Sequence, residues 1–584
     1  MASDSPTRNV PADLAALIDG LPAHDATVVR DWLAGDPNGP DTGRPVGTRA
    51  LFSSTERAVE EFRPASDDEG AIRSVGVIGG GTAGYLTALA LRAKRPWLDV
   101  TLVESAAIPI IGVGEATTPA MVTFLHHYLD IDPERLYREV DPTWKLGIKF
   151  DWGPDPDGFM APFDWDSNAI GMLGALAETG GIDGFSLQSL LMRADRTPVF
   201  RVGDRHVSLM KHLPFAYHLD NGRFVAFLTR LARERGVRHV DARLRDAVLD
   251  SSGNVAALRA DDGSELSFDF YVDCTGFRSM LLGTTMGTPF RSYADSLFTD
   301  SAVTVNTDHG GHLKPYTTAT TMDAGWCWTI PTPQNDHHGY VYSSAALSEE
   351  EAVRELARRF PESTEPRHVK FRVGRREEAW RGNVMAVGNS YAFVEPLESS
   401  GLLMITMGIQ ALVSSLPASL SDPSPRELVN RALADRWDAI RWFLSIHYRF
   451  NTRKDTPFWR DARTRTDISG LQPLVDAYAG GAPLRYRNPF VRALLQTTAP
   501  TFYGLAGVDT ILLGQRVPAR ILRSDEPPAE WHRRHRAAKA LVAHALPQDQ
   551  ALAAYATDPR LLKELLEAPD SWASRATAVR NGMG

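Results

Sequence analysis

Two lysines in an unusually apolar stretch are the first candidates for chemistry. Lys145 and Lys149 lie in the segment DPTWKLGIKFDW at 141–152, beside a tryptophan, an isoleucine and a phenylalanine. In one extended strand the two side chains would share a face, with Gly147 between them. An ammonium group removed from water loses hydration, so its pKa falls and a reactive neutral amine becomes accessible. The alternative is a structural pair whose stems cover apolar surface while the ammonium groups reach water.

An acid beside a predicted helix start is the second candidate. Glu398 precedes Ser399, Ser400 and Gly401, and the apolar run at 402–407 predicts a helix that begins there. Unpaired N–H groups at a helix N-terminus attract anions, so this turn could hold a halide. A carboxylate next to an anion site suggests a general base or a substrate clamp. The alternative is that Glu398 only stabilises the helix dipole.

These candidates need a scaffold, and a glycine-rich turn supplies its start. Residues 75–104 give an apolar strand, a glycine turn, a helix, a second strand and an acid. Gly79 permits the tight turn, Gly81 lets a pyrophosphate approach the backbone, and Gly84 lets the helix pack on the strand. Glu104, about twenty residues after Gly84, is placed to accept from a ribose hydroxyl. The pattern predicts a dinucleotide site; the alternative is a tight turn without a ligand.

Later segments would lie around the same crevice. The loop at 112–116 follows the second strand, and such loops lie beside the ligand in parallel sheets. Alternation in GWCWTIP places Trp326, Trp328 and Ile330 on one strand face, either as core or as a dry wall beside an oxidant. A partner strand is expected at 339–342, since the sequence there is also apolar.

Composition limits the function classes. The chain has 584 residues, more than one compact core holds, and its 43% hydrophobic and 23% charged residues are typical of a globular protein. The net charge of −9 argues against a nucleic-acid groove. Cys274 and Cys327 lack metal-ligand spacing, so no metal site is expected and a reducing, cytoplasmic setting is favoured. We find no signal-peptide core and no apolar run long enough to span a bilayer.

A set of motifs in a fixed order resembles the flavin-dependent tryptophan halogenases. The set comprises the glycine turn, the loop at 112–117, Lys145, the WCWTIP run at 326–331 and EPLESSG at 395–401. Similarity extends from about Arg73 to Trp459 and then thins. The lysine segment and the tryptophan run are fairly specific to the family, whereas many flavoproteins share the nucleotide motif.

The resemblance implies a two-step reaction. FADH2 from a separate flavin reductase, together with O2, would oxidise chloride held by the amides of Ser400 and Gly401 to hypohalous acid. This acid would cross the interior to Lys145, which either becomes a chloramine or, as an ammonium, polarises the acid by hydrogen bonding. Glu398 would position the electrophile or accept the ring proton. Trp326 and Trp328 would keep the organic substrate away from the flavin, and the fixed donor would set the regiochemistry.

The resemblance also implies the fold and the binding residues. The expected fold is α/β: a Rossmann-like FAD-binding domain, whose mixed parallel sheet carries an inserted antiparallel sheet at 238–276, and a mainly helical C-terminal substrate region. Phe163 and Ser399 are expected in the substrate pocket. The expected FAD-binding residues are Gly79, Gly81, Thr82, Ala83, Gly84, Glu104, Gly112, Val113, Gly114, Glu115, Ala116, Gly388 and Gly401.

Three regions are expected along the chain. Residues 1–70 form an N-terminal extension, 71–404 the FAD-binding module with substrate-site segments at about 120–235, and 405–584 the helical C-terminal region. The extension has apolar helical faces that favour packing on the body, and a docking arm for a partner is the alternative. A homodimer is among the expected assemblies.

Departures from the family pattern bear on the substrate. Tyr85 stands where the family usually has tryptophan. The segment at 490–503 lacks the family's tryptophan, and 159–163 keeps Phe163 but lacks the family's histidine, so clamps for a free amino acid are in doubt. A tryptophan inside a peptide fits better, as in the lantibiotic (lanthipeptide) type of tryptophan halogenase.

Other functions remain open on the sequence alone. A halogenase of free tryptophan keeps the same chemistry. A flavin monooxygenase that hydroxylates an aromatic would need only the nucleotide motif, although the tryptophan run argues against it. A flavin-binding interaction protein would explain the extension and the missing clamps. The mass of the product separates these alternatives.

Overall fold

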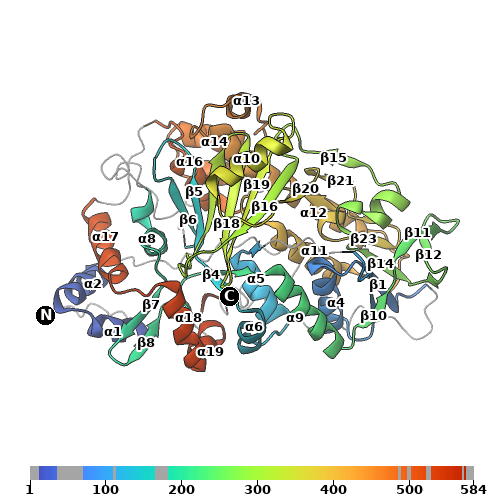
Figure 1. Ribbon diagram of the computed structural model, residues 1–584, viewed down its shortest axis with the longest axis horizontal. Helices are drawn as coiled ribbons and strands as arrows, with labels where there is room; N and C mark the ends of the chain where they lie inside the picture. Colours follow the sequence, from blue (N-terminus) through green and yellow to red (C-terminus); the bar gives the residue numbers. More distant parts are fainter. Residues whose placement is uncertain are drawn as a thin grey trace.

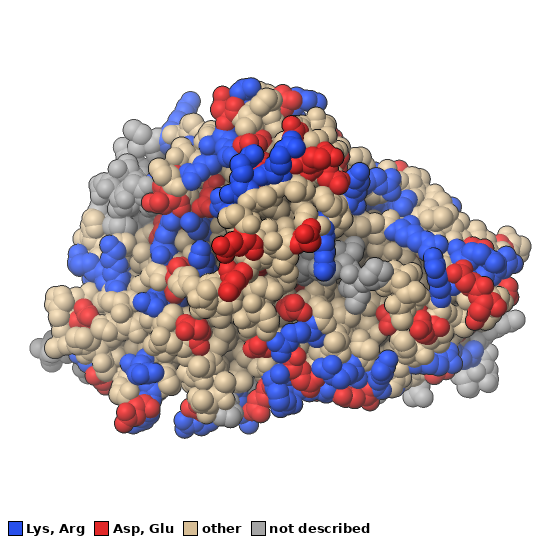
Figure 2. Space-filling view, viewed as in Figure 1, with Lys and Arg blue, Asp and Glu red and all other residues tan. Residues whose placement is uncertain are grey.

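Two large sheets and a series of C-terminal helices organise the part of the chain that the computed structural model describes (Figure 1). The described residues are 12–35, 70–108, 114–164, 182–484, 488–495, 502–520, 528–568 and 571–573. The fold class is α/β with a Rossmann-like parallel sheet, an inserted antiparallel sheet and a helical C-terminal part, as predicted. Acidic and basic side chains are mixed over the face shown in Figure 2.

The first sheet has six strands in the order β10-β2-β1-β14-β23-β22, and every neighbouring pair is parallel except β23 with β22. Its apolar central strands are buried on both faces, as parallel strands require. Helix α4 (Thr82–Lys94) follows β1 directly and packs against α9 (Asn221–Glu234) and α11 (Gly401–Ser415). The strands are β1 (Ser74–Ile78), β2 (Asp99–Glu104), β10 (Arg238–Asp241), β14 (Phe270–Asp273), β22 (Trp380–Arg381) and β23 (Val384–Ala386).

The inserted antiparallel sheet is smaller than predicted. It consists of β11 (Leu244–Leu249), β12 (Val255–Ala260) and β13 (Glu265–Leu266), at the right of Figure 1. The sequence prediction assigned the whole of 238–276 to it, which is wrong because β10 and β14 at the two ends are strands of the parallel sheet. Strand β14 is buried on both faces, so its hydrophobic run is that of a central parallel strand.

The second large sheet has seven strands in the order β20-β16-β19-β18-β17-β5-β6. It is antiparallel except for the pair β5 and β17. The predicted partner strand at 339–342 is confirmed as part of β19, which pairs with β18 along its whole length. The strands are β5 (Gly147–Asp151), β6 (Phe159–Pro162), β16 (Ser301–Thr307), β17 (Thr317–Met322), β18 (Gly325–Pro331), β19 (Asp336–Tyr342) and β20 (Arg367–Lys370).

A three-stranded sheet, β3-β9-β4, carries Lys145. It is formed by β3 (Glu115–Ala116), β9 (Ala216–Leu219) and β4 (Thr143–Lys145). The chain leaves this sheet at Leu146, whose amide donates to Pro315, and enters the seven-stranded sheet at β5. Lys145 and Lys149 therefore belong to different sheets.

The N-terminal helices pack on the body. Helix α2 (Ala23–Gly35) lies against α17 (Pro528–Val542) at the left of Figure 1, and α1 (Ala12–Gly20) contacts β7 (Val199–Val202) and β8 (Arg205–Ser208). His544 lies 2.8 Å from Asp25 across the first contact. The described part of the N-terminal extension therefore packs on the body of the protein, which is the first of the two predicted arrangements.

The remaining elements are mostly helical. Within the described residues, no helix is both long and apolar enough to cross a membrane. The other C-terminal helices are α12 (Ser424–Phe450), α13 (Pro457–Arg465), α14 (Gln472–Ala479), α15 (Pro489–Leu494), α16 (Gly504–Gly514), α18 (Gln548–Thr557) and α19 (Pro559–Glu567). The elements not yet named are α5 (Pro119–Thr123), η1 (Phe124–Tyr128), α6 (Pro133–Val140), η2 (Asp183–Phe185), α8 (Leu187–Arg193), η3 (Gly276–Arg278), η4 (Met280–Thr285), β15 (Phe290–Ser292), α10 (Glu349–Arg359), β21 (Gly374–Arg376), η5 (Gly388–Ser390) and β24 (Ala392–Phe393).

Candidate active site

Lys145 is fully buried at the end of β4. Its Nζ donates to the carbonyl oxygen of Thr117 at 3.0 Å and to Oγ of Ser399 at 2.6 Å. It also lies 5.4 Å from the centroid of the Phe163 ring. Burial lowers the pKa of Lys145 to about 7, while the negative charge of Glu398 acts in the opposite direction. The amine and ammonium forms are therefore both accessible near neutral pH.

Ser399 joins the lysine to the predicted acid. Its φ of 55° lies in the left-handed region, which is uncommon for a residue with a side chain, and this backbone places Oγ on Lys145. Glu398, immediately before it, is 9% exposed and its charge reaches Lys145. The structure thus brings Lys145, Ser399 and Glu398 together, although Lys145 and Ser399 are 254 positions apart in the sequence.

Two side chains that the sequence prediction missed fix Glu398. Nε2 of His447, on α12, lies 2.7 Å from Oε1 of Glu398, and the Tyr503 hydroxyl donates to the Glu398 backbone oxygen at 3.0 Å. His447 is 1% exposed. The only sequence signal for it was a polar residue on the apolar face of a predicted helix, a pattern that structural histidines also give.

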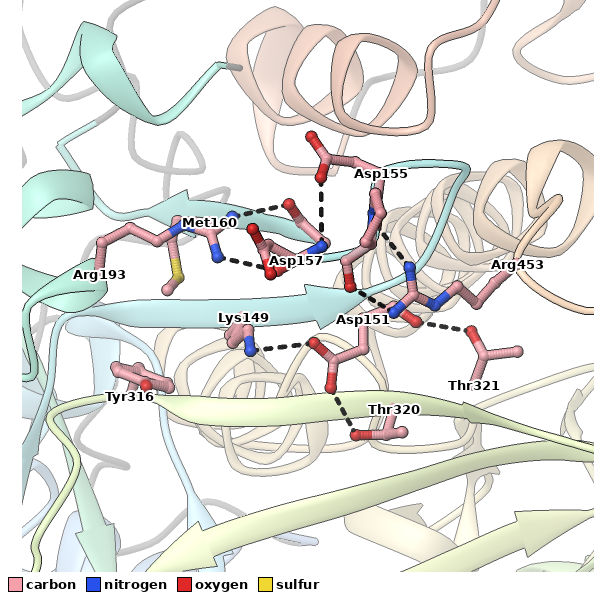
Figure 3. Close-up of polar contacts among 12 residues, drawn as sticks. Lys149, Asp151, Asp155, Asp157, Met160, Arg193, Tyr316, Thr320, Thr321 and Arg453 are labelled. Carbon is pink, nitrogen blue, oxygen red and sulfur yellow. Dashed lines mark hydrogen bonds and ion pairs between the residues drawn. The ribbon is translucent and has the colours of Figure 1, made fainter. Parts of the chain in front are cut away.

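Lys149 does not belong to this site, so the prediction that the two lysines share a face is wrong. Its Nζ pairs with Asp151 at 3.1 Å, and the other oxygen of that carboxylate accepts from Thr320 at 3.0 Å (Figure 3). The Lys149 side chain keeps 26% of its surface exposed. The physical reason is the change of sheet at Leu146, which separates β4 from β5.

Helix α11 begins at Gly401, as the sequence predicts. Ser400 is the N-cap residue of α11 and is fully buried. The Oγ atom of Ser400 has no hydrogen-bond partner among the described residues. A Cβ added to Gly401 would meet no atom within 4 Å, so the space in front of this turn is open. Free helix N–H groups, a buried hydroxyl and open space together could accommodate a small anion.

Trp326 and Trp328 form an aromatic layer on one face of β18. The rings lie 6.0 Å apart at 58°, and the residues are 1% and 7% exposed. The indole N–H of Trp328 has no hydrogen-bond partner in the described part of the chain. Gly339 on β19 makes room for Trp328, since a Cβ there would lie 1.9 Å from the indole. The layer is buried and densely packed, as a barrier to organic substrate would be.

The glycine turn has the geometry of a dinucleotide cradle. Gly79 adopts a φ of 117°, and a Cβ on Gly84 would lie 1.8 Å from the Gly79 carbonyl oxygen. In contrast, a Cβ on Gly81 would meet nothing within 4 Å, which leaves open space at the N-terminus of α4. Gly388 is close by, because its Cβ would lie 3.2 Å from Cβ of Ala83. The open turn at the helix start fits a pyrophosphate.

Glu104 ends β2 beside this turn. Its Oε1 accepts from the Tyr85 hydroxyl at 2.5 Å and lies 2.8 Å from Nε2 of His239. The Thr82 hydroxyl donates to Asn221 at 3.2 Å, which ties α4 to the start of α9. Glu104 is thus held in place beside the glycine turn by two side chains while 23% of its own side chain stays exposed.

Part of the predicted cofactor loop is described. Glu115 and Ala116 form β3, and burial raises the pKa of Glu115 to about 7. Gly114 leaves room for His337, since a Cβ on Gly114 would lie 2.7 Å from that ring. Gly112 and Val113 lie outside the described residues.

Two glycine substitutions separate the fold of the turn from its binding role. We expect Gly81→Ala to keep the thermal unfolding midpoint but to weaken FAD binding by roughly 10-fold, because its methyl group enters space that a pyrophosphate would occupy. Gly84→Ala should instead destabilise the protein by about 1–3 kcal/mol, because its methyl group meets the Gly79 carbonyl. Calorimetric FAD titration and thermal unfolding of both variants check this; unchanged FAD affinity of Gly81→Ala would contradict the assigned cradle.

Both cysteines are free and buried, and burial raises their pKa values. Among the described residues there is no group of three or more His, Cys, Asp or Glu that could hold a metal ion.

Comparison with known proteins gives a consistent result. The tryptophan halogenase family profile matches residues 74–525. The 7-chloro-L-tryptophan 6-halogenase KtzR of Kutzneria sp. (strain 744) is 36% identical over 440 residues, which cover 70% of this chain and 85% of KtzR. The tryptophan 7-halogenase RebH of Lentzea aerocolonigenes is 33% identical over 445 residues, covering 70% of this chain and 83% of RebH.

Solved structures agree with this assignment. The crystal structure of MibH, a lanthipeptide tryptophan 5-halogenase, superposes with a TM-score of 0.86 at 64% identity, covering 89% of this chain and all of MibH. The tryptophan 6-halogenase SttH of Streptomyces toxytricini gives 0.73 at 31% identity, covering 83% of this chain and all of SttH. The family match spans the glycine turn, Lys145, the aromatic layer and Glu398, and we conclude that the chain belongs to the tryptophan halogenase family and is an enzyme of the flavin-dependent type.

Proposed function

We propose that the protein chlorinates the indole ring of a tryptophan within a peptide, with FADH2, O2 and chloride as co-substrates. The observation that carries the proposal is the buried constellation of Lys145, Ser399 and Glu398 directly before the N-terminus of α11. A flavin reductase is the proposed source of FADH2. The proposed compartment is the cytoplasm, where two free cysteines remain reduced.

The glycine turn, Glu104 and the start of α11 are the residues that would hold FAD. The open space at Gly81 and at Gly401 supports this assignment, as does the way Glu104 is held beside the glycine turn. When bound and reduced, FAD supplies with O2 the two-electron oxidation of chloride to hypochlorous acid. The N–H groups at Ser400 and Gly401 would position the chloride, because they carry the positive end of the α11 dipole.

Lys145 would hold hypochlorous acid next to the ring. The Lys145 ammonium has three hydrogens, and two of them already donate to Thr117 and Ser399. The third can donate a hydrogen bond to the oxidant. We propose that the ammonium form acts, because the Glu398 charge favours it. The ammonium donates a proton to the departing hydroxide while the O–Cl bond breaks and the C–Cl bond forms. Glu398 then accepts the proton from the ring carbon, so that water is the only other product.

A peptide substrate is supported by the family comparison. MibH, whose name specifies a lanthipeptide, is 64% identical to this chain. KtzR and RebH, whose names mention tryptophan or chlorotryptophan without a peptide, are 36% and 33% identical. Tyr503, in the segment that lacks the family's tryptophan, already donates to the Glu398 backbone. Tyr503 therefore supports Glu398, the proposed base, which leaves a peptide-bound tryptophan as the proposed substrate.

The test is mass spectrometry of products after turnover with a flavin reductase, NADH, FAD and chloride. We expect tryptophan-containing peptides to gain one chlorine, and free tryptophan to react at least about 10-fold more slowly. Chlorination of free tryptophan alone would contradict the peptide proposal. A gain of oxygen without halogen would instead favour the flavin monooxygenase, and no turnover with any indole would favour a flavin-binding interaction protein.

A further inference from the structure

The contact between His447 and Glu398 fixes where protons must lie. Nδ1 of His447 lies 3.0 Å from the backbone oxygen of Phe443, which can only accept, so Nδ1 carries a hydrogen. Nε2 lies 2.7 Å from Oε1 of Glu398. A lone pair on Nε2 could not face a carboxylate oxygen at that distance without a proton between them. The pair therefore holds one shared proton, either on the acid or on the imidazole.

The imidazole of His447 is enclosed by aromatic rings, so Glu398 has little access to water on this side. His447 is 1% exposed and packs against Phe150, Trp152 and Phe443, with centroids 5.3, 5.9 and 5.2 Å away. An ionised Glu398 in these surroundings needs a hydrogen-bonded cation, and a protonated His447 is placed to be that cation. The ionisable groups that act on the pair are Lys145, which is coupled to Glu398; Glu395, which is coupled to His447; and two tyrosines, Tyr503 near Glu398 and Tyr448 near Glu395.

We propose that His447 is a positioning residue that carries the shared proton and so keeps Glu398 ionised and aimed, which makes Glu398 available as the base. This inference rests on the proposed function. In the step, the ring C–H bond breaks and its proton passes to the free oxygen of Glu398, while the imidazolium keeps its own proton. Lys145 has given one proton to the departing hydroxide, so a proton returned from Glu398 to Lys145 resets the site without exchange with solvent.

The test compares two neutral replacements of the imidazole. In His447→Gln the side-chain amide can stand where Nε2 stood and still donate to Glu398, but it carries no charge. In His447→Asn the amide stands near Nδ1, keeps the contact with Phe443 and leaves Glu398 without a partner. The matched control is His126→Gln, because His126 is also buried and lies 2.7 Å from a backbone oxygen but contacts the hydroxyl of Tyr217 instead of a carboxylate.

We expect His447→Gln to lower kcat for indole chlorination about 10–100-fold at unchanged KM and to move the acid limb of the kcat–pH profile upward by at least about one pH unit. His447→Asn should show the same displaced limb with a larger loss, and His126→Gln should keep the wild-type profile. Adding His447→Gln to a Glu398→Gln background should cost nothing further, since the histidine acts only through Glu398.

Two results separate this inference from the proposed function. Wild-type kcat and pH profile in His447→Gln would overturn the role of His447 while leaving the halogenase intact. If His447→Gln does not fold, as judged by thermal unfolding, the pH profile of His447→Asn decides in the same way. Chlorination of a small external trap reports hypochlorous acid production directly; its absence from the wild-type protein would overturn the proposed function itself.

Discussion

Replacing Lys145 with methionine should lower indole chlorination at least about 10³-fold, because no donor then holds the oxidant beside the ring carbon. Methionine keeps most of the buried volume and removes the amine, so the core around β4 should remain packed. Hypochlorous acid production should persist, since the substitution leaves the backbone N–H groups of Ser400 and Gly401, which would hold the halide, in place. Product analysis by mass spectrometry, with an external trap for hypochlorous acid, measures both effects.

Lys149→Met is the matched control for this substitution. Lys149 lies in the same sequence segment but on another sheet, where it pairs with Asp151 (Figure 3) and keeps 26% of its side-chain surface exposed. Loss of such a pair changes stability by no more than about 1 kcal/mol. Chlorination by the control should therefore stay within about threefold of wild type. If Lys145→Met kept wild-type chlorination, the relay through this lysine would be wrong.

The pH dependence of the wild-type enzyme identifies the acting form of Lys145. Burial lowers the pKa of this lysine to about 7, so raising the pH through that value converts the ammonium to the amine. Since we propose the ammonium as the proton donor to hydroxide, kcat should fall as pH rises above about 7, by up to tenfold per pH unit. A kcat that rises through the same range would instead assign the amine and a chloramine.

The scaffold of the site could be predicted because its signals are local. The turn from Gly79 to Gly84 and the acid Glu104 occupy one βαβ unit, in which spacing alone determines which groups meet. The start of α11 at Gly401 followed from an apolar run after two serines. Pairing between distant strands was harder to predict. Residues 238–241 and 270–273 look like meander strands in the sequence, but in the structure both pair with strands of the parallel sheet.

The chemical site was only partly predictable. Lys145 and Glu398 were candidates from their local sequence, but only the family resemblance joined them in one site, because no local pattern can show that Lys145 meets Ser399, 254 positions later. Lys149 was placed wrongly, since the change of sheet at Leu146 depends on a backbone bond to Pro315 that leaves no mark in the sequence. His447 was missed because it shares the buried face of α12 with apolar residues, and helical periodicity cannot distinguish a core histidine from one that faces a carboxylate.

Replacing Glu398 with glutamine should produce the second largest loss, a fall in kcat of roughly 10²–10³-fold with KM for the peptide little changed. The amide has nearly the same shape and can stay near His447 and Ser399, but it cannot accept the ring proton. The change has a second consequence at Lys145. The charge of Glu398 raises the pKa of the lysine, so without it the lysine loses its proton at lower pH. The falling limb of the kcat–pH profile should therefore move to lower pH in Glu398→Gln.

Glu395→Gln is the control that isolates this charge effect. Glu395 lies three residues earlier, is also buried and accepts a hydrogen bond from the Thr299 hydroxyl, and burial raises its pKa to about 7. Its charge is not among those that shift the pKa of Lys145, so its replacement should change kcat less than about tenfold and should leave the falling limb in place. A steady-state pH series on both variants makes the comparison. If Glu398→Gln lost activity but kept the wild-type falling limb, the Glu398 charge would not affect the pKa of Lys145. The acid and the lysine would then act independently on the ring and on the oxidant.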